Sequence, residues 1–451
     1  MQKRLGSLCA ILCTAMALSL IPVPVLQAQT ALEITHEAGH ELDEKYQPAA
    51  SMIVELETGQ ILWQEEAKKE WAPASLTKIM TLLLVYDAME EGKFTLDTEI
   101  EVTQKYVDIG TKSACSNNNM QLGAKYPVHE LIELLIVPSS AAATQMLADY
   151  VEPDADKFLQ MMNDKAQELG MTQTTYYNCI GVTTNLIAPY HPPSVELDTD
   201  NITSARDKML LARHFLKTYP NVLEHSDEAD IVTLEGTEYE EHFHSHHASL
   251  PGGTQEFEGT DGLKTGSSDT AGYNLIFTAK QKDTRLVQVV LGVSEWGDPN
   301  GEEYRHIVAN ALMQKAFDEY EYKLVLPAGE HKIDGKTIKT TRDLWDCVPK
   351  GEEISYKLVD DKISVDMERE YIDGGEAPSV SYKITFFSQF LKVLGTILKI
   401  LLLIVLILIL LIGGRIAYVA YVKHQRKKRR MQRRASALKD RKTAQEKNPE
   451  Q

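Results

Sequence analysis

Strand-like patterns of apolar and polar positions lie early and late in residues 49–320 of this chain, and helical spacing fills the middle. Residues 50–63 alternate and contain the turn Glu57-Thr58-Gly59, which predicts a β-hairpin. Two further apolar runs, 271–279 and 284–293, predict a second strand pair. Because early and late strands enclose a helical region, we expect one mixed sheet covered by helices, an α/β domain of the α+β kind.

The helices of the middle region are predicted by apolar residues that recur every three or four positions. This spacing begins behind Ser75 and returns over residues 129–150, where Pro138 breaks the pattern. Two more helices are predicted over 204–218 and 307–320. The last of these closes the domain.

After residue 320 the pattern changes twice. Residues 322–384 contain short alternating stretches separated by Gly and Asp turns, which predict a small all-β domain. Residues 400–414 are then almost all Leu, Ile and Val, and with their apolar flanks they reach the about 20 residues needed to cross a bilayer. Helical apolar spacing over 387–398 predicts an interfacial helix that leads into this transmembrane helix.

The resulting domain order has six parts. We expect a signal peptide (1–28), a polar lead (29–48), an α/β domain (49–320), a small β-rich domain (321–385), an interfacial helix and membrane segment (386–422, core 397–420) and a basic tail (423–451).

Charge indicates which side of the membrane each part occupies. Lys3 and Arg4, an apolar run and small residues near Ala28 predict a secretory signal, with a retained N-terminal helix as the alternative. From Arg415 onward there are thirteen Lys or Arg and three Asp or Glu, a net charge of +10, which predicts a cytoplasmic tail. The whole chain carries −18, so the exported part carries about −30 and is not expected to bind nucleic acid.

We therefore expect a single-pass protein of the cell membrane, with its folded domains outside and its C-terminal helix in contact with lipid. Outside the signal peptide the cysteines are Cys115, Cys179 and Cys347. An odd and sparse set does not form a disulfide framework, although one bridge stays open.

The tetrad Ser75-Leu76-Thr77-Lys78 places a hydroxyl and an amine one helical turn apart. A serine hydroxyl needs a base in order to attack an acyl carbon, and a buried amine with a lowered pKa can accept its proton. The alternative is a helix N-cap at Ser75 with a solvated lysine in the first turn.

The triad Lys264-Thr265-Gly266 leads into the apolar run at Ala271, at the predicted start of a strand. An edge strand can hold an extended peptide by backbone pairing. Lys264 and Thr265 could then bind a terminal carboxylate while Gly266 allows close approach. A surface hairpin without a ligand is the alternative.

With both motifs in this order, the chain resembles the serine D-alanyl-D-alanine carboxypeptidases, the low-molecular-weight branch of the penicillin-binding proteins. The resemblance runs over residues 49–320 and includes Glu57–Gln60, Asn178–Val182 and Ser204–Asp207. It implies a serine β-lactamase/transpeptidase-like fold and removal of the terminal D-Ala from peptidoglycan stem peptides through an acyl-enzyme. It also implies β-lactam antibiotics as covalent inhibitors, and no metal or organic cofactor.

The resemblance also implies roles for individual residues. Ser75 would be the nucleophile, Lys78 its general base and Ser139 a proton relay to the leaving amine. Lys264, Thr265, Gly266 and Ser267 would bind substrate. The backbone N–H groups of Ser75 and Ser267 would form the oxyanion hole.

The family's middle motif, Ser-x-Asn, departs from its pattern here, because the chain has Ser139-Ser140-Ala141. Losing one polar contact typically costs about 1–3 kcal/mol, or roughly 10–200-fold in rate. A slower enzyme is therefore expected. The alternative is a degenerate homologue that binds stem peptides or a protein partner without turnover. A class A β-lactamase is disfavoured because no Glu-rich loop follows at the expected distance.

Two polar runs leave alternatives open. His242, His244, His246 and His247 form either a metal site or a His-rich polar hairpin. The run Asn117–Asn119 is either a loop at the cleft edge or a replacement for the missing Asn.

Overall fold

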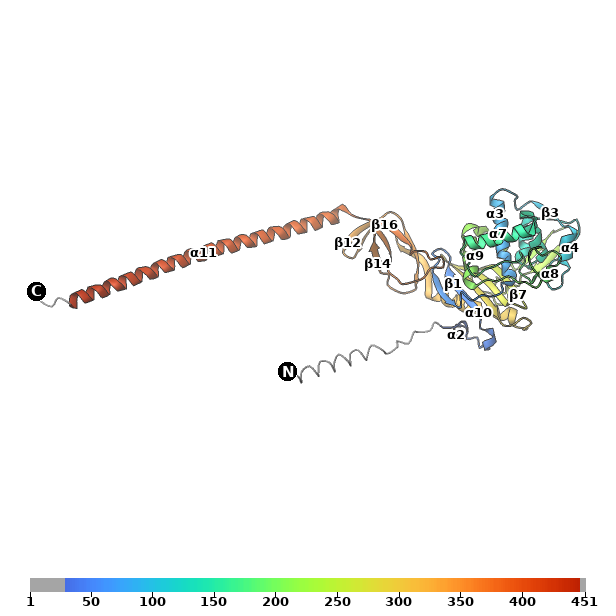
Figure 1. Cartoon of the computed structure of the whole chain (residues 1–451), viewed down its shortest axis with the longest axis horizontal. Coiled ribbons are helices and arrows are strands. Elements are labelled where there is room, and N and C mark those ends of the chain that lie inside the picture. Colours follow the sequence, from blue (N-terminus) through green and yellow to red (C-terminus); the bar gives the residue numbers. More distant parts are fainter. Residues whose placement is uncertain (1–28, 447–451) are drawn as a thin grey trace. The chain divides into compact units, whose positions relative to one another are not determined.

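The computed structural model of the protein describes residues 29–446, so the predicted signal peptide lies outside the described residues. The chain forms two compact units (Figure 1). The first contains the residues up to Leu326 together with Leu344–Lys357 and Ser364–Ser379. The second contains Pro327–Asp343, Leu358–Ile363 and the residues from Val380 onward. Residues 321–385 are thus divided between the two units.

The centre of the first unit is a five-stranded sheet in the order β2-β1-β9-β8-β7. All neighbouring strands are antiparallel. The predicted hairpin, the predicted late strand pair and their union in one sheet are confirmed, and β7 lies at the edge. The strands are β1 (Ala50–Glu55), β2 (Ile61–Glu65), β7 (Thr260–Ser268), β8 (Gly272–Gln281) and β9 (Thr284–Val293).

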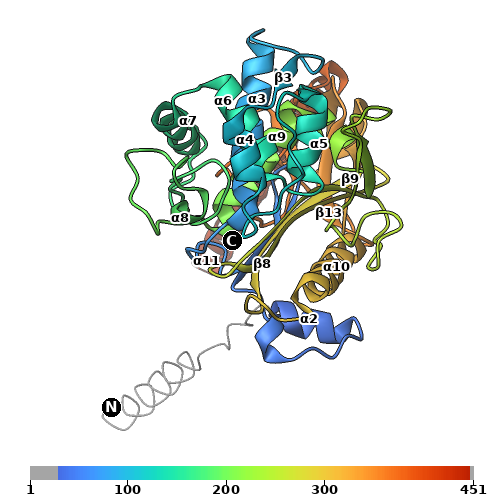
Figure 2. The same ribbon diagram turned by 90° about the vertical axis from the view of Figure 1, so that its right-hand side faces the viewer.

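One face of the sheet is covered by α10 (Gly301–Glu319) and by α2 (Ala31–Glu37), as Figure 2 shows. Helix α2 lies in the segment expected to be a polar lead. Thr30 and Glu33 form a reciprocal capping box at its start, and Ala31, Leu32 and Ile34 are buried. This short helix forms because its apolar side can pack against the sheet cluster.

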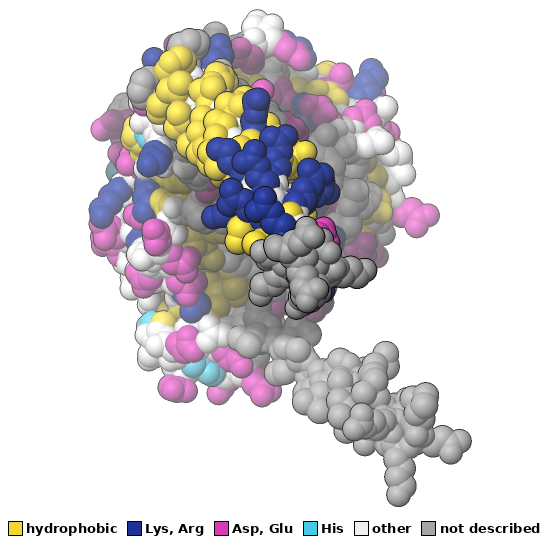
Figure 3. All heavy atoms as spheres, turned by 90° about the vertical axis from the view of Figure 1, so that its left-hand side faces the viewer, with side chains coloured by type: hydrophobic (Ala, Val, Ile, Leu, Met, Phe, Trp, Pro, Cys, Tyr) yellow, Lys and Arg dark blue, Asp and Glu magenta, His cyan; other side chains and the backbone are white. Residues whose placement is uncertain are grey.

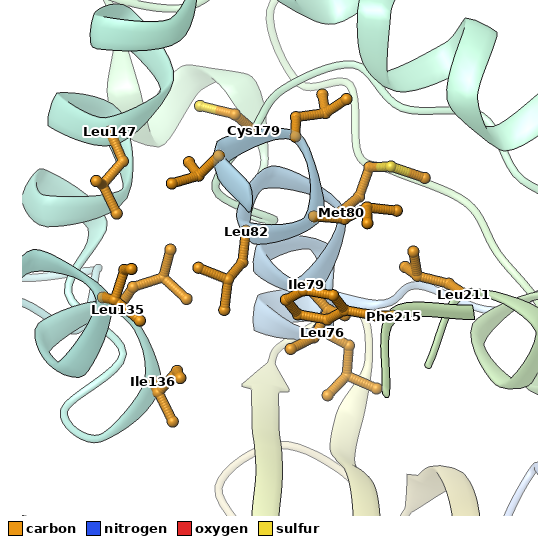
Figure 4. Packing of buried hydrophobic residues seen from close by; sticks show 14 of the residues in the cluster. Leu76, Ile79, Met80, Leu82, Leu135, Ile136, Leu147, Cys179, Leu211 and Phe215 are labelled. Carbon is orange, nitrogen blue, oxygen red and sulfur yellow. The ribbon is translucent and has the colours of Figure 1, made fainter. Parts of the chain in front are cut away.

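The other face carries the helical middle of the chain. Helix α3 is surrounded by apolar side chains from several other helices, including Leu135, Leu147 and Phe215 (Figure 4). The predicted helical region 129–150 is confirmed as α5 and α6, which separate around Pro138. The helices are α3 (Lys78–Glu90), α4 (Gln104–Gly110), α5 (Val128–Ile136), α6 (Ala141–Val151), α7 (Ala155–Glu168), α8 (Thr184–Ile187) and α9 (Ala205–Thr218), with 3-10 helices η2 (Glu44–Tyr46), η3 (Ala74–Thr77) and η4 (Pro220–His225).

Two small hairpin-like sheets lie at the periphery of the helical region. They pair β3 (Glu99–Glu101) with β4 (Lys125–Pro127) and β5 (Asp230–Thr233) with β6 (Glu241–His244).

The predicted β-rich character of residues 322–384 is confirmed. Strands β10 and β13 form a two-stranded sheet, and five more strands pair in the order β11-β12-β16-β15-β14. Their bounds are β10 (Tyr320–Leu326), β11 (Gly329–Ile333), β12 (Lys336–Thr340), β13 (Leu344–Pro349), β14 (Tyr356–Val359), β15 (Lys362–Val365) and β16 (Ser379–Ile384).

The C-terminal part is one continuous helix, α11 (Phe386–Glu446). By length and composition it can cross a membrane, with a mean hydropathy of 3.2 in its most apolar window, and this indicates membrane association. Lys and Arg side chains of α11 gather next to the hydrophobic side chains of the same helix (Figure 3).

Candidate active site

The hydroxyl and the amine of the Ser-x-x-Lys motif meet in the structure. Ser75 lies in η3, and Lys78 is the first residue of α3. Lys78 Nζ donates to Ser75 Oγ over 2.8 Å and to the carbonyl oxygen of Ile180 over 3.0 Å. The lysine is 1% exposed, so its amine lies inside the protein while the serine remains partly accessible. This arrangement favours the nucleophile–base interpretation over a helix cap.

Burial changes the protonation of this amine. Desolvation lowers the pKa of Lys78 from 10.5 to about 8. The neutral amine is therefore accessible near neutral pH, and a neutral amine can remove the proton of the serine hydroxyl.

A tight loop places the carbonyl group that holds Lys78. Asn178 Oδ1 accepts from the backbone N–H groups of Ile180 (3.1 Å) and Gly181 (2.8 Å). Gly181 has φ +86°, and a Cβ on it would lie 2.0 Å from the carbonyl oxygen of Ala74. Glycine is thus required for this loop to lie against the turn that carries Ser75.

The Lys-Thr-Gly motif lies in the middle of β7, rather than at the start of a strand. A Cβ on Gly266 would lie 3.1 Å from Ser75 N and 3.0 Å from Leu76 N, so the strand runs directly beside η3. Lys264 is buried, and its Nζ donates to the carbonyl oxygen of Thr265 over 3.0 Å. Burial, followed by the charge of Lys78, lowers the pKa of Lys264 well below its ordinary value.

An ion-pair network that the sequence analysis did not find lies behind the next residue of β7. Arg305 of α10 is 0% exposed, donates to Ser267 Oγ over 2.8 Å and pairs with Glu302. Glu302 also accepts from the Ser267 hydroxyl over 3.0 Å. The i, i+3 spacing of Glu302 and Arg305 was the available signal, but it does not show which strand the pair meets.

The middle motif has an unusual local geometry. Ser139 has φ +63° and is buried, and its hydroxyl has no hydrogen-bond partner within residues 29–446. The next residue, Ser140, caps α6 by accepting from Ala143 N over 3.1 Å. Ala141 is buried in the first turn and supplies no polar group.

The asparagine run is used to hold that helix start. Asn117 Oδ1 accepts from the backbone N–H of Ala142 over 3.0 Å, and Asn118 Oδ1 accepts from Ser140 Oγ over 2.7 Å. The amide nitrogen of Asn118 donates to Glu241 over 3.3 Å. These contacts favour a loop at the cleft edge over a replacement for the missing Asn.

The histidine run does not converge on one point. His242 contacts Glu240 at 3.0 Å and His244 contacts Asp230 at 2.8 Å, whereas His247 is buried beside His306. Strands β5 and β6 pair antiparallel, so His242 and His244 lie on one strand of a hairpin. No group of three or more His, Cys, Asp or Glu that could hold a metal ion occurs in the part of the chain that the structure describes.

The Ser-x-x-Lys and Lys-Thr-Gly motifs thus lie on one edge strand and the adjoining turn, and the same region of the sequence matches a known family. The model of the peptidase S11 family, described as D-alanyl-D-alanine carboxypeptidase, matches residues 37–295. The chain belongs to this family. A second model, for a domain of unknown function, matches residues 322–383.

Individual members of the S11 family agree with this assignment. D-alanyl-D-alanine carboxypeptidase DacF of Bacillus subtilis is 25% identical over 289 residues, which cover 64% of this chain and 64% of DacF. The match therefore spans less than two thirds of that relative.

Two solved structures are similar in fold. The peptidoglycan synthesis regulatory factor PBP3 of Streptococcus pneumoniae has a TM-score of 0.65 and 26% identity, covering 74% of this chain and 97% of that chain. Penicillin-binding protein D2 of Listeria monocytogenes in its cefotaxime-bound form has a TM-score of 0.50 and 25% identity, covering 62% and 99%.

Proposed function

We propose that the protein is a serine-type D-alanyl-D-alanine carboxypeptidase that removes the terminal D-Ala from peptidoglycan stem peptides. The observation that carries this proposal is the buried amine of Lys78, 2.8 Å from the hydroxyl of Ser75 and beside the edge strand β7. Membership of the S11 family supports the same reaction class.

In the proposed mechanism, Ser75 Oγ attacks the carbonyl carbon of the penultimate D-Ala and its proton passes to Lys78 Nζ. The C–N bond then breaks, and the terminal D-Ala leaves with a proton delivered to its amine. Ser139 is suited to relay that proton because its buried hydroxyl has no partner within residues 29–446. Water attacks the acyl-enzyme ester in the second half, again with Lys78 as the base, and restores Ser75.

Strand β7 supplies the proposed binding groups. Because β8 pairs with it on one side only, alternate backbone groups of β7 are available to an extended peptide. Lys264 and Thr265 would hold the terminal carboxylate, and Gly266 leaves room for the peptide backbone. The N–H groups of Ser75 and Ser267 would stabilise the oxyanion.

The structure also supports turnover despite Ala141. An asparagine at this position would orient the catalytic amine, but here the carbonyl of Ile180 already holds Lys78 over 3.0 Å. The loss is therefore expected to reduce the rate and not to abolish the reaction.

We extend the proposal to inhibitors and location. The cefotaxime-bound form of the Listeria relative supports covalent inhibition of this chain by β-lactams. The apolar helix α11 and the basic residues after it support a single-pass anchor, with the active site outside the cytoplasm and the tail inside.

Labelling with a fluorescent penicillin tests the proposal. The full chain should become covalently labelled, and Ser75→Ala should not. A second assay measures D-Ala release from a free pentapeptide. Absence of label on the wild-type chain would overturn the acyl-transfer proposal, and label without D-Ala release would leave a binding protein that acylates without useful turnover.

A further inference from the structure

An open groove of about 700 Å³ adjoins the end of β7, beyond the residues assigned to catalysis. Its lining includes Asp269 and Thr270, which follow the strand, and Trp71, which precedes η3 by a few residues. The groove therefore adjoins the two chain segments that carry the proposed catalytic residues, and nothing in the proposed mechanism uses it.

Two tryptophans give the groove its aromatic character. Trp296 is 54% exposed, and its ring lies 5.7 Å from that of Tyr273 at an interplanar angle of 32°. Trp71 donates its indole N–H to the carbonyl oxygen of Ala271 over 2.9 Å. Trp296 therefore presents an exposed indole face to the groove, in an orientation that its contact with Tyr273 helps to fix.

The charges of the residues that line the groove balance. Lys45 and Lys69 line it together with Asp269 and Glu295. Lys45 is also paired with Asp298 at 2.6 Å, and the ammonium of Lys69 lies 5.2 Å from the centre of the Trp71 ring. A groove with aromatic faces, polar donors and acceptors and no excess charge suits a neutral polar ligand, which is the character of a sugar.

The direction of the substrate leads into this groove, and this step rests on the function proposed above. With the terminal carboxylate at Lys264 and Thr265 and the scissile carbonyl beside Ser267, the peptide runs antiparallel to β7. Its N-terminal side passes Ser268 and reaches Asp269 and Thr270 within about 10 Å. In peptidoglycan that end of the stem peptide is attached to an N-acetylated amino sugar.

We propose that the groove is a glycan subsite, in which the N-acetylated amino sugar that carries the stem peptide stacks on Trp296 and is bordered by Trp71 and Lys69. The protein would then distinguish stem peptides attached to glycan from free peptides of the same sequence.

The test compares one pentapeptide in two forms, free and attached to its disaccharide, with the full chain in detergent. The ratio of kcat/KM for D-Ala release, glycan-linked over free, should be about fivefold to tenfold for the wild type. Trp296→Ala should bring the ratio close to one, and Trp296→Tyr should keep most of the preference. Trp345→Ala removes a partly exposed tryptophan of β13 and should leave the ratio unchanged.

Equal kcat/KM values for the two substrates in the wild type, or an unchanged ratio in Trp296→Ala, would overturn the subsite while leaving the carboxypeptidase proposal intact. If neither substrate releases D-Ala, the carboxypeptidase proposal fails, and calorimetric binding to the Ser75→Ala chain still decides the subsite. That chain should bind the glycan-linked peptide at least fivefold more tightly than the free peptide, and equal affinities would overturn the subsite.

Discussion

The amine of Lys78 determines how the proposed reaction should depend on pH. Only the neutral amine can accept the serine proton, and burial brings its pKa to about 8. The acylation rate by a penicillin should therefore rise about tenfold per pH unit below that value and level off above it. Stopped labelling reactions from about pH 6 to about pH 10 measure this profile. A midpoint near 10.5, as for a solvated lysine, would contradict the assignment of Lys78 as the base.

Ala141 gives a second prediction at the same scale. Ala141→Asn should restore an amide in the first turn of α6 and raise the rate of D-Ala release by about tenfold. The thermal midpoint should be followed in parallel, because adding volume at a buried position typically costs about 1–3 kcal/mol. Ala141→Leu serves as a control that adds the same number of heavy atoms with the same branching but no amide, and it should not raise the rate. An unchanged rate in a stably folded Asn variant would show that the Ile180 carbonyl already compensates fully.

Contacts between site residues can be predicted from the sequence where the two residues are close along the chain. Ser75 and Lys78 lie three positions apart, so helical spacing alone brings them together. The Lys78 contact with Ile180 joins residues 102 positions apart, and the Arg305 contact with Ser267 joins residues 38 positions apart. No pattern along the chain specifies such pairs, because they arise only when the loop and α10 pack against the sheet.

At the scale of elements, the site depends on how closely β7 approaches η3. A methyl group on Gly266 would lie 3.0–3.1 Å from the backbone nitrogens of Leu76 and Ser75, so the strand or the turn would have to shift. Gly266→Ala should lower the rate of penicillin acylation by about tenfold, because relieving these contacts needs a shift smaller than the displacement of about 1 Å that can cost about 100-fold.

The control for this variant is its stability. Its thermal midpoint should stay close to that of the wild type, because Gly266 does not need a left-handed backbone conformation. Full acylation in Gly266→Ala would show that the strand does not need to lie so close to the nucleophile.

The elements were predictable where strong periodicity marks them. The strands at 271–279 and 284–293 and the helices around Pro138 agree with the sequence pattern, since their burial is one-sided or continuous. The sequence pattern predicts a polar lead where helix α2 lies, because three apolar residues in seven give little periodicity and only the capping box at Thr30 and Glu33 indicates a helix.

At the scale of the whole molecule, membrane attachment and penicillin acylation should depend on different parts of the chain. Removal of residues 386–451 takes away α11, so the shortened chain should leave the membrane fraction while keeping its penicillin label. Sedimentation of labelled membranes measures both properties. A second truncation that removes only residues 423–451 keeps the apolar stretch and should remain with the membranes.

The position of β7 at the edge of the sheet also affects whether neighbouring copies of the protein aggregate. Exposed edge strands attract other chains through their unpaired N–H and C=O groups, and membrane proteins meet their copies at high density in one plane. Here η3 packs against β7 at Gly266 and so covers part of the free edge. We expect this cover to hinder pairing of the edge with the sheet of another copy, and therefore to reduce edge-to-edge aggregation.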